Sequence, residues 1–408
     1  MPASPGNKPG YTRQPVPDAI KSLGRIIGWG AFLACSWTWC IGMFLPVLLR
    51  RDFGPASFWV FAIPNVVGAA LMGVLLHRPG ASREFVQRHH LAALVFSAVT
   101  IAFQWYFALW QLKFGWQPMG IVIGSGLLAA FASRTKFGPL WAAVSWLASL
   151  VCAVLWRSEQ GLRAGPTPLL PADHLMPLAA VCVLGFALCP WLDLTFHAAR
   201  QALPGRTGSW AFIVGFGVLF FAMILFTHAY GPHLLATPAG EPLITGLLMG
   251  HIAWQLGYTM GVHGAAAAGL QSHGAEPPRA GRALTPVVVG GLFGLAGIFA
   301  SAGMSQWGEL LYRSFMVFYG LIFPAYIVTC APRLPGAPGP TRRQFAVLAG
   351  VVLLALPCYW LGFMEKQTWW LLPGVLIVLA GRLFIGRGES PARPELSPAP
   401  APALARLN

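Results

Sequence analysis

Apolar runs of about 20 residues recur along almost the whole chain, separated by short segments that carry charges, proline or glycine. A helix rises about 1.5 Å per residue, so each run is long enough to cross a hydrocarbon core about 30 Å thick. The runs predict twelve membrane-spanning helices, near residues 24–49, 56–77, 91–112, 118–133, 137–156, 175–199, 208–230, 242–267, 285–305, 310–330, 344–364 and 368–385. The expected fold is an all-α polytopic membrane protein.

The two ends of the chain differ from the predicted transmembrane bundle at residues 24–385. Residues 1–23 begin with a polar, proline-rich stretch without an apolar core, so we expect a cytoplasmic tail and not a cleavable signal peptide. Residues 386–408 are rich in proline and alanine, a composition typical of a disordered tail. The sequence therefore predicts one membrane domain between two tails.

Composition supports a membrane protein and argues against several kinds of site. The chain is 56% hydrophobic and 10% charged, whereas an ordinary soluble domain has about 25% charged residues. Its 47 glycines and 35 prolines suit membrane helices, which pack closely and tolerate lost backbone bonds. The seven cysteines lie in apolar runs without a CxxC pair, which argues against a disulfide framework or a thiolate metal site. We expect neither a resident metal nor a cofactor.

Basic residues are distributed unequally between the two sides of the predicted bundle. If the N-terminus is cytoplasmic, 20 of the 27 Lys and Arg residues fall in cytoplasmic segments and 7 on the opposite side. The positive-inside rule therefore predicts that both termini are cytoplasmic, as an even number of spans requires. Cytoplasmic loops that face anionic lipid account for the net charge of +15, so no nucleic-acid partner is needed. We expect a multi-pass protein of a bacterial inner membrane.

Asp193 is the only acidic residue inside a predicted span, in the segment LGFALCPWLDLTFHAAR at residues 184–200. A carboxyl group there is costly and usually faces a cavity or a partner. Helical spacing brings His197 within reach of Asp193, and Pro190 predicts a kink or break of the helix. Asp193 and His197 are therefore candidates for coupling a cation or a proton. The alternative is an interfacial cluster of Asp193, His197 and Arg200.

The second predicted span carries Pro64 and Asn65 at its centre. Pro64 removes one backbone donor, and Asn65 brings a donor and an acceptor to the same depth. This pattern indicates a helix break and a ligand or ion site. The alternative is a simple kink whose Asn65 bonds a neighbouring helix.

Further polar residues fall at a similar depth in other spans. In the eighth span His251, Gln255 and Tyr258 share one helical face, opposite a face of alanine and glycine suited to close packing. Gln104 of the third span lies within about 5 Å of the same level. We therefore expect Asn65, Gln104, His251, Gln255 and Tyr258 to bind a substrate near the membrane centre. The alternative for His251 is a buried histidine that bonds a neighbour.

The sequence contains no Walker, HExxH or GxSxG motif and no set of histidines like that of a haem-copper oxidase, which lowers the odds of an ATP-driven pump, and no pore repeat suggests a channel. The class that these exclusions favour is a secondary transporter, which moves a small solute and is coupled to sodium or protons. The expected partners are the lipid bilayer, that solute and the coupling cation. We expect no enzymatic activity.

Two segments carry a resemblance to a known superfamily. CIGMFLPVLLRRDFG, at residues 40–54, resembles the Ile-Gly and Phe-x-x-Pro signature in the first helix of amino acid, polyamine and organocation transporters, through Ile41, Gly42, Phe44 and Pro46. FAIPNVVGA, at residues 61–69, is similar to sodium:solute and nucleobase symporters of that superfamily. The resemblance implies a LeuT-like fold: a five-plus-five inverted repeat with helices one and six broken around a midplane site, followed by two further helices.

Two other functions remain open at this stage. His197, His228, His251 and Tyr258 lie in predicted spans and could serve a haem- or metal-binding redox or sensor protein. A membrane scaffold without transport is the third possibility, because a number of spans does not dictate a function.

Overall fold

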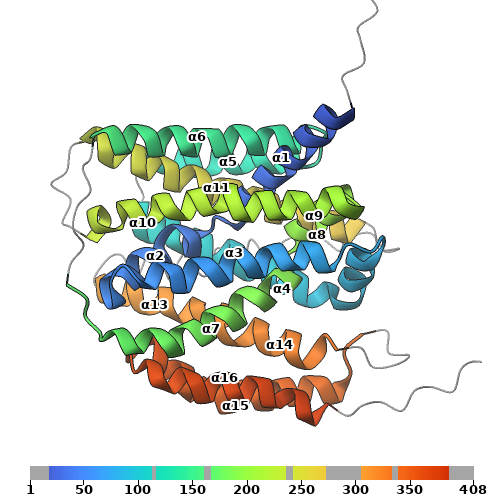
Figure 1. Ribbon diagram of the computed structural model, residues 1–408, viewed down its shortest axis with the longest axis vertical. Helices are drawn as coiled ribbons and strands as arrows, with labels where there is room; N and C mark the ends of the chain where they lie inside the picture. Colours follow the sequence, from blue (N-terminus) through green and yellow to red (C-terminus); the bar gives the residue numbers. More distant parts are fainter. Residues whose placement is uncertain are drawn as a thin grey trace, which may run out of the picture.

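The computed structural model describes residues 18–112, 116–159, 167–235, 242–272, 305–332 and 339–385. Within these ranges every regular element is a helix, and the long helices run side by side as a bundle (Figure 1). Three predicted segments lie outside the described residues: positions 1–17 of the N-terminal tail, positions 285–304 of the ninth span, and the tail 386–408.

The first half of the bundle contains α1 (Asp18–Trp37), α2 (Cys40–Phe53), α3 (Ser57–Leu75), α4 (Ala81–Leu112), α5 (Trp116–Ser133) and α6 (Gly138–Glu159). The middle contains η1 (Ala172–His174), α7 (Leu175–Leu188), η2 (Cys189–Leu192), α8 (Leu194–Ala202), α9 (Gly205–Val214), η3 (Gly215–Phe220), α10 (Phe221–Leu235) and α11 (Pro242–Ser272). The last part contains α13 (Ser305–Val317), η4 (Phe318–Ile322), α14 (Phe323–Cys330), α15 (Arg342–Phe363), η5 (Thr368–Trp370), α16 (Leu371–Ala380) and η6 (Gly381–Phe384).

Eight helices of the described ranges are long and apolar enough to cross a membrane, or nine if the bent pair α1 and α2 forms one span. The chain is therefore a multi-span helical membrane protein, as the apolar runs predict. The twelve predicted spans are not all found. The helix α11, with its polar and small residues, is not among the eight, and Thr368–Phe384 is a shorter apolar helix.

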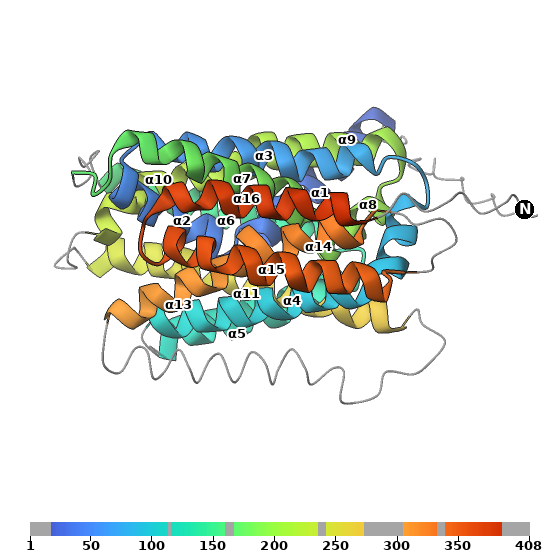
Figure 2. The same cartoon turned by 90° about the horizontal axis from the view of Figure 1, so that it is seen from below.

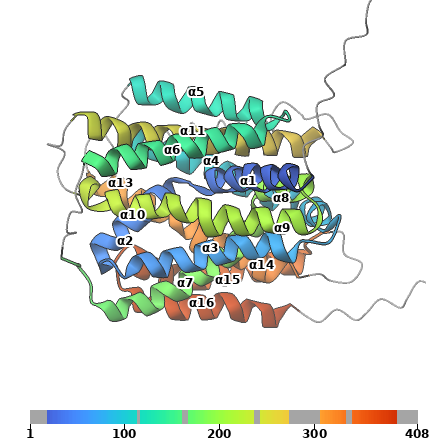
Figure 3. The same ribbon diagram turned by 45° about the horizontal axis from the view of Figure 1, so that its top comes forward.

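The helices at the edges of the bundle expose apolar side chains. The pair α5 and α6 lies at one edge and the pair α15 and α16 at the opposite edge (Figures 1 and 3). On α5, Leu127 and Phe131 are 67% and 71% exposed. On α15, Leu353 and Leu354 are each 69% exposed. Such surfaces suit contact with lipid chains. Seen from below, α15 and α16 cover the central helices (Figure 2).

Among the described residues, two of the predicted spans are interrupted, the first near its middle and the sixth in its second half. In the first, the chain bends by 59° between α1 and α2, at Thr38 and Trp39. In the sixth, α7 passes into the turn η2, which contains Pro190, and Asp193 is extended (φ −78°, ψ 111°) before α8 begins. The second span, in contrast, has no break at Pro64, since α3 is one continuous helix.

Close backbone approach joins α11 to α5. A Cβ atom added at Gly257 would meet the Val122 carbonyl of α5, and one added at Gly261 would meet the Gly126 carbonyl. Only glycine allows the two helices to approach this closely. The small-residue face of α11 thus packs on α5, and its opposite face turns toward α1 and α6.

The first and last described residues lie at the same end of the bundle, on the right in Figure 1. At the opposite end the loop before α7 pairs with the end of α2, because Leu170 N donates to the Asp52 carbonyl at 2.8 Å. The site described next lies between these two ends of the bundle.

Candidate functional site

The interrupted backbone between α1 and α2 is held by side chains from distant helices. Gln104 of α4 accepts a hydrogen bond from the backbone N–H of Cys40, the first residue of α2, at 3.2 Å. Tyr312 of α13 donates to the Cys40 carbonyl at 3.0 Å, and the Trp39 indole donates to the Ser36 carbonyl at 2.5 Å. These bonds replace some of those that a continuous helix would make. Gln104 therefore lies at the break.

A small cavity of about 10 Å³, close to the space that one water molecule needs, lies between the two helix breaks. Asn65 lines it, and its Oδ1 accepts a hydrogen bond of 2.6 Å from the Trp37 indole. The other lining residues come from the break, from the end of α7 and from η4: Trp37, Trp39, Ile41, Gly42, Gly185, Phe186, Cys189 and Tyr319. Four segments distant in the sequence thus meet at one mid-bundle site.

A larger apolar cavity adjoins the small one. It has a volume of about 70 Å³ and is lined mainly by leucine, valine, phenylalanine and methionine side chains of α2, α7, α13, η4, α15 and α16. Gly185, Phe186 and Tyr319 border both cavities. The space therefore extends from the helix breaks toward the end of the bundle where α2 ends and α13 begins.

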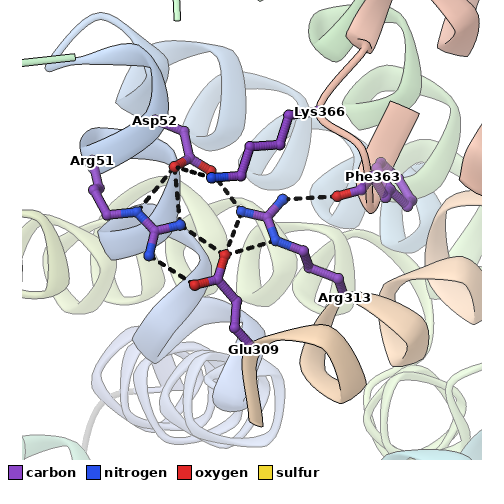
Figure 4. A network of polar contacts seen from close by, with 6 residues as sticks. All are labelled: Arg51, Asp52, Glu309, Arg313, Phe363 and Lys366. Atoms are coloured by element: carbon purple, nitrogen blue, oxygen red, sulfur yellow. Dashed lines mark hydrogen bonds and ion pairs between the residues drawn. The ribbon is translucent and has the colours of Figure 1, made fainter. Parts of the chain in front are cut away.

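A network of charged side chains lies at that end of the larger cavity (Figure 4). Glu309 of α13 forms a two-pronged ion pair with Arg51 of α2, at 2.7 and 2.8 Å, and also binds Arg313 at 2.8 Å. Asp52 is 1% exposed and binds Arg313 at 2.6 Å, Arg51 at 2.9 Å and Lys366 at 3.4 Å. Arg313 lines the cavity. The network joins α2, α13 and the turn after α15.

Asp193 lies at the break of the sixth span and is fully buried. Its Oδ1 accepts a bond of 2.7 Å from Thr195 N, which caps the first turn of α8, and lies 2.6 Å from the Thr195 hydroxyl. Its Oδ2 lies 3.7 Å from Nε2 of His263 on α11, also fully buried. Asp193 and His263 form the Asp193–His263 pair.

The predicted partners of Asp193 bond elsewhere. The ring of His197 lies 2.9 Å from the Trp191 carbonyl through Nε2 and 2.9 Å from the Ser82 hydroxyl through Nδ1. Arg200 donates to the carbonyls of Leu76, His77 and Gly205. Asp193, His197 and Arg200 do not lie along one face of a continuous helix as the spacing predicted, because the chain is extended at Asp193.

His263 was not among the site residues predicted from the sequence. The predicted span 242–267 placed it near a helix end, but α11 continues to Ser272, so His263 lies inside the helix. The sequence feature that could have identified His263 is its place on the same helix as His251 and Gln255.

His251, Gln255 and Tyr258 of α11 are buried, but on a different side of α1 from Asn65. The Gln255 amide donates to the Ser149 hydroxyl of α6 at 2.7 Å, and the His251 ring lies 3.1 Å from the same hydroxyl. Gln255 also reaches Cys35 of α1, whereas Asn65 reaches Trp37. The expected polar set is thus divided. Asn65 lines the small cavity and Gln104 bonds the backbone at the break, whereas His251 and Gln255 lie at the α6–α11 contact.

In the part of the chain that the structure describes, no group of three or more His, Cys, Asp or Glu side chains could hold a metal ion. No known family model matches the sequence, and no curated protein matches it. Fold and site together define the class as a multi-span helical membrane protein with buried polar groups at two helix breaks.

Proposed function

We propose that the protein is a secondary transporter that moves a small solute across a membrane, coupled to a gradient of sodium or protons. The observation that carries this proposal is the meeting of two broken spans at a cavity in the middle of the bundle. Discontinuous helices expose backbone groups that ligands can use, and transporters build their midplane sites from them. A small solute would bind between Trp37, Asn65 and Tyr319 when movement of the two breaks widens this cavity.

The arrangement of the two cavities supports alternating access. In this proposal the charged network, whose Arg313 lines the larger cavity, closes that end and shuts off the central site from that side. Movement of α2 away from α13 would break the network and open the larger cavity to water. We assign that end to the outside of the cell, because Arg51, Arg313 and Lys366 belong to the predicted segments with fewer Lys and Arg residues. Both termini are then cytoplasmic.

The resemblance to amino acid, polyamine and organocation transporters gains support from the location of the breaks. That resemblance implies interruptions in the first and sixth helices, and the two interrupted spans are the first and sixth in sequence order. A LeuT-like inverted repeat is accordingly part of the proposal. The metal- or haem-binding alternative gains no support from the described side chains, and no contact favours a scaffold.

Purified protein tests the proposal directly. We expect one member of a panel of amino acids, polyamines, organic cations and nucleobases to raise the melting temperature, by an amount that grows with the logarithm of its concentration above the Kd. The same compound should accumulate in proteoliposomes only when a sodium or proton gradient is imposed. If a monodisperse protein neither binds nor accumulates any member of the panel under either gradient, the proposal is wrong.

A variant of the cavity identifies the binding site. Asn65→Ala removes a polar group from the cavity and should raise the Kd of the solute. Val67→Ala is a matched control on the same helix, because Val67 is 49% exposed on the outer surface of α3 and should leave the Kd unchanged. Equal effects of the two variants would place the solute elsewhere.

A further inference from the structure

The Asp193–His263 pair is an incompletely satisfied group of buried atoms. Asp193 Oδ2 and His263 Nε2 face one another at 3.7 Å, too far for a hydrogen bond, and both atoms lack a hydrogen-bond partner among the described residues. The remaining atoms are anchored, since Oδ1 bonds Thr195 and the His263 Nδ1 lies 3.3 Å from the Ser97 hydroxyl. The unfilled position of this site is therefore the gap between Asp193 Oδ2 and His263 Nε2.

No permanently charged cation of the described residues balances the Asp193 carboxylate. Arg200, on the same helix as Thr195, is bonded to backbone carbonyls. From α1, the Ser36 hydroxyl lies 3.0 Å from that of Thr195, and the Ser36 backbone interacts with the His263 ring, so neither brings a positive charge. The other titratable groups near Asp193 are the Cys189 thiol of η2 and the Tyr319 phenol of η4, and both are neutral when protonated. On α4, His89 bonds Tyr326. His263 is therefore the neighbour that can take a positive charge.

A single proton completes this site. An isolated charge inside a membrane bundle is costly, whereas a carboxylate and a histidine that share one proton are neutral as a pair. An approach of about 1 Å would convert the 3.7 Å separation into a charge-assisted hydrogen bond. A hard cation such as sodium prefers oxygen ligands. Asp193 Oδ2 instead faces an imidazole nitrogen of His263. The indole of Trp39 lies beside the imidazole, with 5.8 Å between the ring centroids.

The pair is mechanically linked to the proposed solute site. Asp193 lies at the break of the sixth span, and Trp39, at the break of the first, contacts the His263 ring and also lines the small cavity. Loss of the proton would leave a buried negative charge and favour separation of α8 from α11. Such a movement would shift the two breaks that enclose the cavity.

We propose that Asp193 and His263 together bind the proton whose gradient drives transport, so that the coupling ion is H⁺ and not Na⁺. This assignment rests on the proposed transport function and adds the identity of the coupling ion. His263, in place of His197, is the partner of the carboxylate.

The charge that the pair moves can be measured without knowing the solute. Wild-type protein in liposomes on a solid-supported membrane should give a transient current after a pH jump and none after a sodium jump at constant pH. Asp193→Asn and His263→Gln should each reduce the pH-jump current to the level of empty liposomes. His89→Gln is the control, since His89 is also buried but bonds the Tyr326 hydroxyl, and it should retain the current.

If Asp193→Asn fails to fold, His263→Gln still tests the proposal, because the His263→Gln variant retains Asp193 and its cap of α8. A wild-type protein that is silent to the pH jump, or a His263→Gln protein with the full current, overturns the proposal. A sodium-jump current that Asp193→Asn abolishes also overturns it, and leaves ion-coupled transport standing. A pH-jump current lost in both variants, without accumulation of any solute of the panel, supports the proton pair and refutes the transport proposal.

Discussion

Asp193 has two separate roles at its two oxygens, and substitutions can separate them. Oδ1 caps the first turn of α8, and Oδ2 faces His263. Asparagine is as good an N-cap as aspartate, whereas loss of a cap costs about 0.5–2 kcal/mol. We expect Asp193→Ala to lower the melting temperature of the purified protein more than Asp193→Asn does, as followed by tryptophan fluorescence. Equal melting temperatures of the two variants would show that the cap contributes no stability.

Trp37 and Asn65 form the buried hydrogen bond beside the small cavity. Trp37→Phe keeps much of the aromatic contact but leaves Asn65 Oδ1 without its donor, which should cost about 1–3 kcal/mol. Thermal unfolding should show this loss, while Trp370→Phe, a change at a side chain 46% exposed, should have little effect. A Trp37→Phe protein as stable as the wild type would mean that this bond contributes nothing.

The sequence could predict some of these residues and not others. Asp193 and Asn65 were identifiable because a polar group inside an apolar run needs a partner or a cavity. Their partners were not, since Trp37 looks like any apolar residue and His263 lies 70 positions from Asp193. The charged network was missed for the same reason: Asp52 and Glu309 are separated by 257 positions and appear as ordinary residues at span ends.

At the scale of helices, proline alone does not determine where a span breaks. Pro64 and Pro190 look alike in the sequence, yet α3 is continuous and the sixth span is interrupted. After Pro190 the extended chain is stabilised by the Asp193 cap. The break between α1 and α2 contains no proline, and its backbone is held by Gln104 and Tyr312. Because these contacts are distant in the sequence, local patterns could not locate that break.

The packing of α11 on α5 provides a test at the same scale. Gly257→Ala would place a methyl group against the Val122 carbonyl, and overpacking of this kind costs about 1–3 kcal/mol. Gly264→Ala is a matched control on the same helix, because no atom of a neighbouring element lies within 4 Å of the added carbon. The melting temperature should fall for Gly257→Ala only. A similar fall for both variants would attribute the loss to the backbone of α11 and not to this contact.

At the scale of the whole molecule, the apolar runs were sufficient to predict a multi-span bundle, because each helix must satisfy its own backbone within lipid. They could not predict the central site, because it is assembled from four segments whose contacts depend on how the helices pack. The same packing gives the larger cavity and its charged rim. The function proposed for this rim leads to the last prediction.

The ion pair between Glu309 and Arg51 joins α13 to α2 at the end of the larger cavity, which Cys182 of α7 lines. If the network holds that end closed, Glu309→Gln should weaken it and let water-soluble reagents enter. In a variant that retains Cys182 but replaces the six other cysteines by alanine, a small methanethiosulfonate should modify Cys182 faster after Glu309→Gln. Glu84→Gln, which affects an ion pair with Arg78 outside this network, should leave the rate unchanged. An unchanged rate in Glu309→Gln would mean that the network does not control access to the cavity.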